Sequence, residues 1–304
     1  MAKGFLLIVV LTMSQIAQHA FRSGTELVAL NVTVTGEEGN VVRGLTQAAF
    51  AVAEDGKPQP IAQFAAEGVP LSLVVAIDAS ESMRGRRIEF ARQAVLRLLD
   101  RLDSDDEFYV FGFNDRVFNV TRGTKNRDEV ARALANVHPH GGTALYDAVP
   151  AGVQVLERAR HRRRALVVIS DGNDDVPTPR QLDARSIRDA REAEAIANVR
   201  RTEALVYAIG VNPRNGGGLE RLDIAALDRL TKPTGGDTLL VASDDAVTSA
   251  AERLGDELRL QYVLGFQPAH PGDGKFHRVQ VTVIDCDKCR ARTRAGFIAD
   301  KASR

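Results

Sequence analysis

The sequence has no excess of charge of either sign, because 40 Lys and Arg residues balance 40 Asp and Glu residues. A general nucleic-acid-binding protein normally carries a basic excess, so the balance argues against that class, although it leaves room for a local patch. Long apolar runs are also scarce. The longest, residues 5–13, is too short to cross a bilayer as a helix. We therefore expect no nucleic-acid partner and no integral membrane span beyond an N-terminal signal.

Cysteine is scarce as well: only Cys286 and Cys289 occur, and Asp287-Lys288 separates them. A zinc site would need two more ligands, and no second pair exists. A two-residue hairpin between the flanking strand patterns would bring the two thiols close enough for a disulfide, which fits an exported protein. We favour a disulfide over free thiols. A redox pair ranks third, because the α/β context of such a motif is missing here.

The N-terminus has the pattern of an export signal. Lys3 supplies one positive charge, and the short apolar run of residues 5–13 follows it. No clean A-x-A site precedes a cut after Ala17, Ala20 or Ser23. We expect residues 1–23 to be a signal peptide or an N-terminal tail, and the chain to be periplasmic, secreted or at the cell surface. A cytoplasmic location is the alternative.

Residues 69–258 alternate apolar runs with helical patterns. The helical spacing is clearest after Gly85, where Ile88, Ala91 and Val95 fall on one face. The expected strands are residues 71–77, 108–113, 165–169, 205–211 and 238–241. The further helices are expected over residues 127–137, 145–160, 184–202, 219–231 and 245–258. Such alternation with continuously apolar strands predicts an α/β domain with a doubly wound, mostly parallel sheet.

The flanks, residues 24–68 and 259–300, have the alternating apolar and polar residues that are typical of β-strands. Leu30, Val32 and Val34 alternate with polar residues, and Asp55-Gly56 is a hairpin signal. Each flank has about 40 residues and alone would bury little core. Joined, they would form a sandwich of about seven strands. We therefore predict that the α/β domain is inserted into a small discontinuous β-sandwich. The rival arrangement is two separate β appendages.

Five oxygen-bearing side chains follow or face the strand ends of the α/β domain. These residues are Asp78, Ser80, Ser82, Thr143 and Asp171. Ligands bind outside the carboxyl ends of strands in an open parallel sheet, so the five are expected at one rim. An all-oxygen set suits Mg²⁺, Mn²⁺ or Ca²⁺ rather than zinc. For any one of them alone, helix capping or loop bonding is the simpler interpretation.

The set "DASES", Thr143 and Asp171 resembles the metal-ion-dependent adhesion site of von Willebrand factor type A domains and integrin inserted domains. All five positions of that pattern are present in the family's order. The resemblance implies that Ser80, Ser82 and Thr143 contact a divalent cation, most often Mg²⁺. It also implies that Asp78 and Asp171 act directly or through water. It covers about residues 70–250. An open coordination position would then accept an Asp or Glu carboxylate of a protein partner.

The flanks also resemble a bacterial group of exported von Willebrand A-related proteins common in Acidobacteria. The similar segments are "GLTQAAFAVAEDGKPQPI" and "YVLGFQP…ARTRAGF". This resemblance implies export and little about mechanism.

Three functions are compatible with these sequence features. The first is a non-enzymatic, divalent-cation-dependent protein-binding or adhesion module. The second is a metal-assisted hydrolase, for which Glu81 and His140 are the only candidate bases. The third is a cytoplasmic assembly factor that acts with a chaperone-like ATPase, as some bacterial von Willebrand A proteins do. A genuine export signal would exclude the third function.

Overall fold

A computed structural model describes residues 27–66, 69–121, 123–176, 183–212, 222–284 and 286–299. The first strand of the α/β unit lies in the middle of a six-stranded sheet. This strand, β5 (Leu71–Asp78), has only buried residues. The others are β6 (Glu107–Phe113), β7 (Val117–Asn119), β8 (Arg163–Ser170), β9 (Leu205–Val211) and β10 (Thr238–Val241). Their order is β10-β9-β8-β5-β6-β7, and every neighbouring pair is parallel except β6 and β7.

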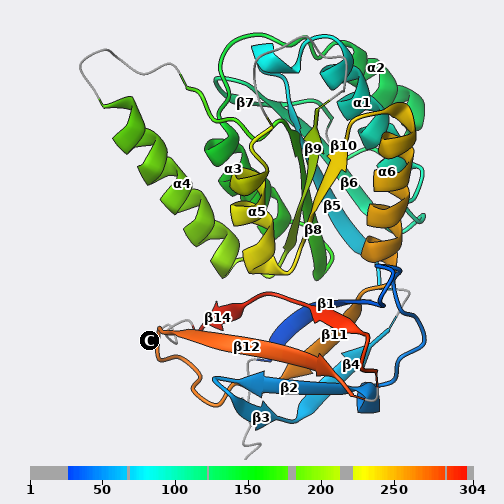
Figure 1. The fold of residues 1–304 in the computed structure, drawn as a ribbon, viewed down its shortest axis with the longest axis vertical. Coiled ribbons are helices and arrows are strands. Elements are labelled where there is room, and N and C mark those ends of the chain that lie inside the picture. Colours follow the sequence, from blue (N-terminus) through cyan, green and yellow to red (C-terminus); the bar gives the residue numbers. More distant parts are fainter. Residues whose placement is uncertain are drawn as a thin grey trace, which may run out of the picture.

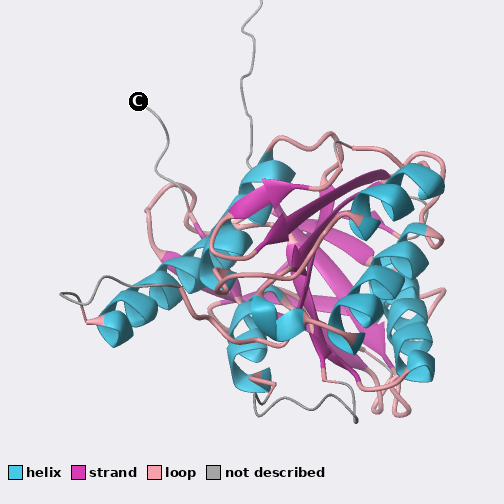
Figure 2. Ribbon diagram, turned by 90° about the horizontal axis from the view of Figure 1, so that it is seen from above, coloured by secondary structure: helices cyan, strands magenta, loops and turns pink. Residues whose placement is uncertain are grey.

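Helices cover both faces of this sheet (Figures 1 and 2). Successive side chains of a strand point to opposite faces. Leu73 and Val75 therefore enter one core, and Val74 and Ala76 enter the other. The first core contains α1 (Arg86–Leu99), α2 (Arg127–Ala135) and α6 (Asp244–Arg259). The second contains α3 (Leu145–Glu157), α4 (Ala184–Arg201) and α5 (Ile224–Thr231). The predicted doubly wound, mostly parallel α/β architecture is confirmed.

Strands from both flanks of the α/β unit form two four-stranded sheets (Figure 1). One sheet contains β13 (Arg290–Arg292), β1 (Val28–Thr35), β11 (Tyr262–Phe266) and β4 (Ile61–Ala65), in that order. The other contains β14 (Gly296–Ile298), β12 (Phe276–Val283), β2 (Phe50–Glu54) and β3 (Lys57–Gln59). The short 3-10 helices are η1 (Gln47–Ala49), η2 (Glu81–Met83) and η3 (Lys232–Thr234).

The two flanks share one apolar core. Phe50, which precedes the α/β unit, packs against Tyr262, which follows it, with ring centroids 5.0 Å apart. The insertion of the α/β unit into a discontinuous β-sandwich is therefore confirmed, and the rival of two separate appendages is wrong. The sandwich has eight described strands rather than about seven.

A disulfide joins Cys286 and Cys289, but the hairpin expected around it is wrong. The preceding strand, β12, pairs with β2 and β14, whereas the following strand, β13, pairs with β1 in the other sheet. The amide of Cys289 donates to the carbonyl of Cys286 at 3.1 Å, which closes a tight turn. The disulfide therefore fixes the turn at which the chain passes from one sheet to the other.

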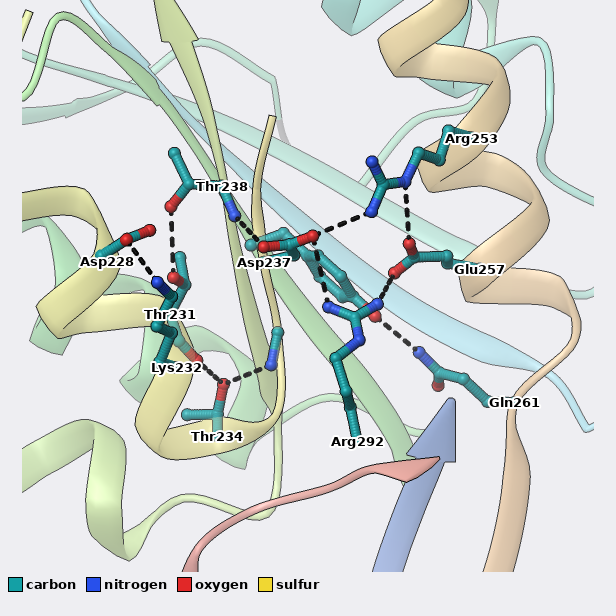
Figure 3. A network of polar contacts seen from close by, with 12 residues as sticks. Asp228, Thr231, Lys232, Thr234, Asp237, Thr238, Arg253, Glu257, Gln261 and Arg292 are labelled. Atoms are coloured by element: carbon teal, nitrogen blue, oxygen red, sulfur yellow. Dashed lines mark hydrogen bonds and ion pairs between the residues drawn. The ribbon is translucent and has the colours of Figure 1, made fainter. Parts of the chain in front are cut away.

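A network of charged side chains around one buried carboxylate, Glu257, joins the α/β unit to the sandwich (Figure 3). Arg292 of β13 pairs with Glu257 of α6, and its Nη1 lies 3.5 Å from Asp237 Oδ2. Arg253 pairs with the same two carboxylates, at 3.2 Å from Glu257 and 2.9 Å from Asp237. Glu257 is only 1% exposed, so it depends on both guanidinium groups.

Candidate metal centre

Asp78 and Asp171 leave the sheet at the same edge because their strands are parallel neighbours. Ile77 of β5 lies opposite Ile169 of β8, and each aspartate follows within two residues. Both side chains are fully buried. The hydroxyl of Ser170 donates to Asp78 Oδ2 at 2.6 Å and holds that carboxylate in place.

Asp78 ends β5, and Ser80 and Ser82 follow it directly in the loop that contains the 3-10 helix η2. Asp78 Oδ1 accepts a hydrogen bond from the Ser80 amide at 2.9 Å. The hydroxyl oxygens of Ser80 and Ser82 are 3.1 Å apart. Ser80 is buried and Ser82 is half-buried. Three of the five predicted residues therefore converge within this loop.

Backbone hydrogen bonds attach the Thr143 loop to the Asp78 loop. The His140 amide donates to the Ala79 carbonyl at 2.9 Å, and the Glu81 amide donates to the Gly141 carbonyl at 3.0 Å. Thr143 is 4% exposed. It exchanges two backbone hydrogen bonds with Asp175, four residues after Asp171. The structure thus places all five predicted residues in three connected loops at one edge of the sheet.

The surroundings of Asp78 and Asp171 are unfavourable for two ionised carboxylates. Burial and the charge of Asp171 raise the pKa of Asp78 to about 7, although hydrogen bonds from Ser170 and Ser80 act in the opposite direction. Within the described part of the chain, Asp171 Oδ2 accepts no hydrogen bond although it is buried. Arg87 Nη1 forms an ion pair with this oxygen at 3.6 Å. An oxygen-binding cation at this edge would satisfy both carboxylates, so the donor set fits a hard divalent ion.

Two functional side chains were not predicted. Ser170 positions Asp78, and Arg87 lies between the Ser82 carbonyl, to which its Nη1 donates at 2.7 Å, and Asp171. Ser170 directly precedes Asp171 in "VVISDG", and this place at a strand end could have marked Ser170 as a candidate site residue. Nothing distinguishes Arg87 in "RGRRIEF" from an exposed helix residue, and only the structure shows that it is buried.

The two candidate bases are engaged elsewhere. Glu81 is largely exposed and pairs with Arg84 at 2.7 Å. His140 Nε2 lies 3.0 Å from Asn114 Nδ2, and its Nδ1 lies 2.8 Å from the His138 carbonyl. Both ring nitrogens of His140 thus have neighbours that orient the ring, one in its own loop and one, Asn114, directly after β6.

Comparison with known proteins agrees with this geometry. Residues 73–173, which contain all five rim residues, match the family model of the von Willebrand factor type A domain. The inter-alpha-trypsin inhibitor heavy chain H4 of Sus scrofa is 32% identical over 118 residues, which are 36% of this chain and 13% of that protein. An uncharacterized protein of Synechocystis sp. is 30% identical over 110 residues, which are 35% of this chain and 26% of that protein. The chain therefore spans a small part of both relatives.

A solved structure of a von Willebrand factor type A protein from Catenulispora acidiphila shares the fold. Its TM-score is 0.53 at 14% identity, and the superposition covers 93% of this chain and 76% of that chain. The family-model match and the shared fold support a von Willebrand factor type A domain in this chain. Domains of this type commonly bind a divalent cation. Among the described residues, no helix is both long and apolar enough to cross a membrane.

Proposed function

We propose that this protein is an exported, non-enzymatic binding module that captures an acidic residue of a partner protein through a divalent cation. Asp78, Ser80, Ser82, Thr143 and Asp171 hold the ion, and Mg²⁺ is the ion we expect, with Mn²⁺ and Ca²⁺ as alternatives. The observation that carries the proposal is the pair of buried carboxylates, one of which has an oxygen without a hydrogen bond in the described part of the chain.

The chemistry of the donor set explains why the partner would supply a carboxylate. Only two of the five ligands are anionic, so the ion keeps positive charge that an outside Asp or Glu can neutralise. The loops that carry the ligands lie at the carboxyl edge of the sheet, where open α/β sheets bind their ligands.

The alternatives have less support. A hydrolase needs a base beside the metal, but Glu81 is paired with Arg84 and the ring of His140 is held by its neighbours. A cytoplasmic assembly factor would work in a reducing compartment, where the Cys286–Cys289 disulfide would not be expected to persist. The disulfide therefore supports export. The export segment itself, residues 1–23, lies outside the described residues.

Selection from a displayed library of random peptides tests the proposal. The full chain is immobilised in Mg²⁺, bound peptides are eluted with a chelator, and the Thr143→Ala chain serves as the matched control. We expect the eluted peptides to share an Asp or Glu that cannot be replaced by Asn or Gln, and the variant to retain none of them. Peptides that bind both chains equally, or that need no acidic residue, would contradict the proposal.

A further inference from the structure

A second cluster of ligating side chains lies in the β-sandwich, separate from the rim of the α/β unit. Glu54, Asp55 and His277 each offer one ligand atom, and these three atoms all lie within 4.8 Å of one another. His277 Nδ1 is 2.8 Å from Asp55 Oδ2 and 3.6 Å from Glu54 Oε1. The cluster joins the end of β2 and the turn after it to β12.

Glu54 is the unusual member of this cluster because it is 1% exposed. Its Oε2 accepts a hydrogen bond from the Ala269 amide at 2.8 Å. Its Oε1 has no hydrogen-bond partner among the described residues, although it faces the imidazole. One proton on His277 Nδ1 cannot serve two carboxylates, and Asp55 is the closer of the two. A buried carboxylate oxygen is thus left without a hydrogen bond, and the imidazole nitrogen 3.6 Å away is its ion-pair neighbour.

The other two ligands are already held in place. Asp55 has a φ of 48° in the tight turn with Gly56, and its Oδ1 accepts from the Arg278 amide at 2.9 Å. The ring of His277 lies between those of His270 and Phe297, with centroid distances of 5.6 and 5.5 Å. Little reorganisation is therefore needed before an ion can bind.

A third carboxylate, that of Asp273, lies beside the other ring nitrogen of His277. Asp273 Oδ1 lies 3.1 Å from His277 Nε2, on the side of the ring away from Asp55. A carboxylate on the second ring nitrogen is the usual support of a metal-binding histidine, because it fixes the tautomer that leaves the first nitrogen free to ligate.

We propose that Glu54, Asp55 and His277 form a second metal site, selective for a transition metal and best suited to Zn²⁺. The ion takes the place of the proton on His277 Nδ1 and is ligated by one oxygen from each carboxylate. One nitrogen and two carboxylate ligands suit Zn²⁺, in contrast with the all-oxygen rim of the α/β unit. Three protein ligands leave a fourth position for water. The bound ion ties the β2–β3 turn to β12.

Zn²⁺ titration of the full-length Thr143→Ala chain tests this site, because that substitution weakens the rim of the α/β unit. Competition with a chromogenic chelator gives the stoichiometry and the Kd. We expect one Zn²⁺ per chain, and a Kd at least tenfold weaker after either Glu54→Gln or His277→Gln. Asp273→Asn should weaken binding by about 10- to 100-fold, as the loss of an outer-shell partner does. His161→Gln is the matched control, because it removes a histidine of the α/β unit whose Nε2 lies 2.9 Å from the Asp105 carbonyl, and it should leave the Kd unchanged.

Glu54→Gln keeps the shape of the side chain and removes its charge, so a folded variant should be available for the comparison. Histidine nitrogen spectra of the otherwise unmodified protein provide a second measurement, in which Zn²⁺ should shift the Nδ1 signal of His277. The absence of Zn²⁺ binding to the Thr143→Ala chain, or binding that survives both Glu54→Gln and His277→Gln, would overturn the proposal.

Discussion

Asp78 is a carboxyl group whose surroundings oppose its charge. It is fully buried beside Asp171, and its pKa is raised to about 7 from an ordinary 3.8 by burial first and by that neighbour second. The folded, metal-free chain therefore carries an electrostatic cost at neutral pH, and a bound cation would remove it. The raised pKa means that Asp78 is more stable as a protonated acid than as an isolated anion.

This cost predicts how the stability of the metal-free protein depends on pH. Between about pH 4 and pH 7 the folded state binds more protons than the unfolded state, so the free energy of unfolding should fall as pH rises and level off above pH 7. The part due to Asp78 is at most about 4 kcal/mol. Urea unfolding of the unmodified chain and of Asp78→Asn, both in chelator, isolates the contribution of Asp78. A difference between the two proteins that stays constant with pH would contradict the assignment.

Ser170 gives a second prediction at this scale. Its hydroxyl donates to Asp78 Oδ2 at 2.6 Å, so Ser170→Ala should weaken divalent-metal binding by about tenfold or more. Ser72→Ala is the matched control, because Ser72 is equally buried on β5, and its hydroxyl donates to Glu107 at 2.6 Å. Both variants should lose about 1 kcal/mol of stability. Calorimetric titration should show a changed metal affinity for Ser170→Ala alone.

At the scale of elements, the rim depends on how two loops are joined. The loop before α3 makes backbone hydrogen bonds to the loop after β5, and the Gly142 amide donates to Asp115 Oδ1 at 2.6 Å. Thr143 follows directly. Its position is therefore set by the turn at Gly141 and Gly142 rather than by the helix that begins after it.

Gly141→Ala should displace this loop. Gly141 has a φ of 77°, and an added Cβ would lie 2.3 Å from Asp115 Oδ2, which would disturb the Asp115–Gly142 hydrogen bond. We expect at least a tenfold loss of metal affinity. Gly39→Ala controls for the backbone cost of about 1 kcal/mol, since Gly39 has a φ of 78° and no atom within 4 Å of the added Cβ. Equal metal affinities in the two variants would contradict this role for Gly141.

The sequence predicted most elements because their apolar periodicity is strong. β5 and β9 are buried throughout and mostly apolar, and the helix after Gly85 has a clear buried face. The three-residue strand β7 is too short to show a period. The helix expected over residues 219–231 begins at Ile224, where Asp223 accepts from the Ala226 amide at 2.9 Å. The preceding residues, with the glycines at 216–218, lie outside the described part of the chain.

The candidate site was predicted where residue type and strand position coincide. Asp78 and Asp171 have both signals, the two serines follow Asp78 directly, and Thr143 follows two glycines before a helix, so the sequence predicted all five at one edge. Arg87 and Glu54 were missed because their importance comes from burial, and burial of a charged side chain depends on contacts distant in the sequence. The hairpin error at Cys286 has a related cause, since local spacing predicts the turn but not the sheets that its two arms join.

At the scale of the whole molecule, we propose that residues 69–258 form one unit and that residues 24–68 and 259–300 form the other. In the described residues, direct contacts join the two units in addition to the chain itself. Ala295 donates to the Pro233 carbonyl at 3.0 Å, and Asn31 Nδ2 donates to the Glu203 carbonyl at 3.1 Å. Together with the ion pairs of Figure 3, these contacts hold the sandwich against the α/β unit.

Arg292→Ala should weaken this contact. Loss of the guanidinium leaves the buried Glu257 with Arg253 as its remaining ion-pair partner among the described residues, so the unfolding free energy should fall by roughly 3 kcal/mol. Arg290→Ala on the same strand removes an exposed side chain and should cost less than about 0.5 kcal/mol. Urea unfolding measures both. Equal losses would show that the Arg292 network does not stabilise the molecule.

Thermal unfolding in chelator and then in millimolar Mg²⁺, Mn²⁺ or Ca²⁺ tests the central claim most directly, with Thr143→Ala beside the unmodified chain. An ion that binds only the folded state raises its stability by RT ln(1 + [L]/Kd). We predict that at least one ion raises the midpoint of the unmodified chain and that the variant responds much less. Equal responses of the two chains, or no response of the unmodified chain to any ion, would contradict a metal centre built from these five residues.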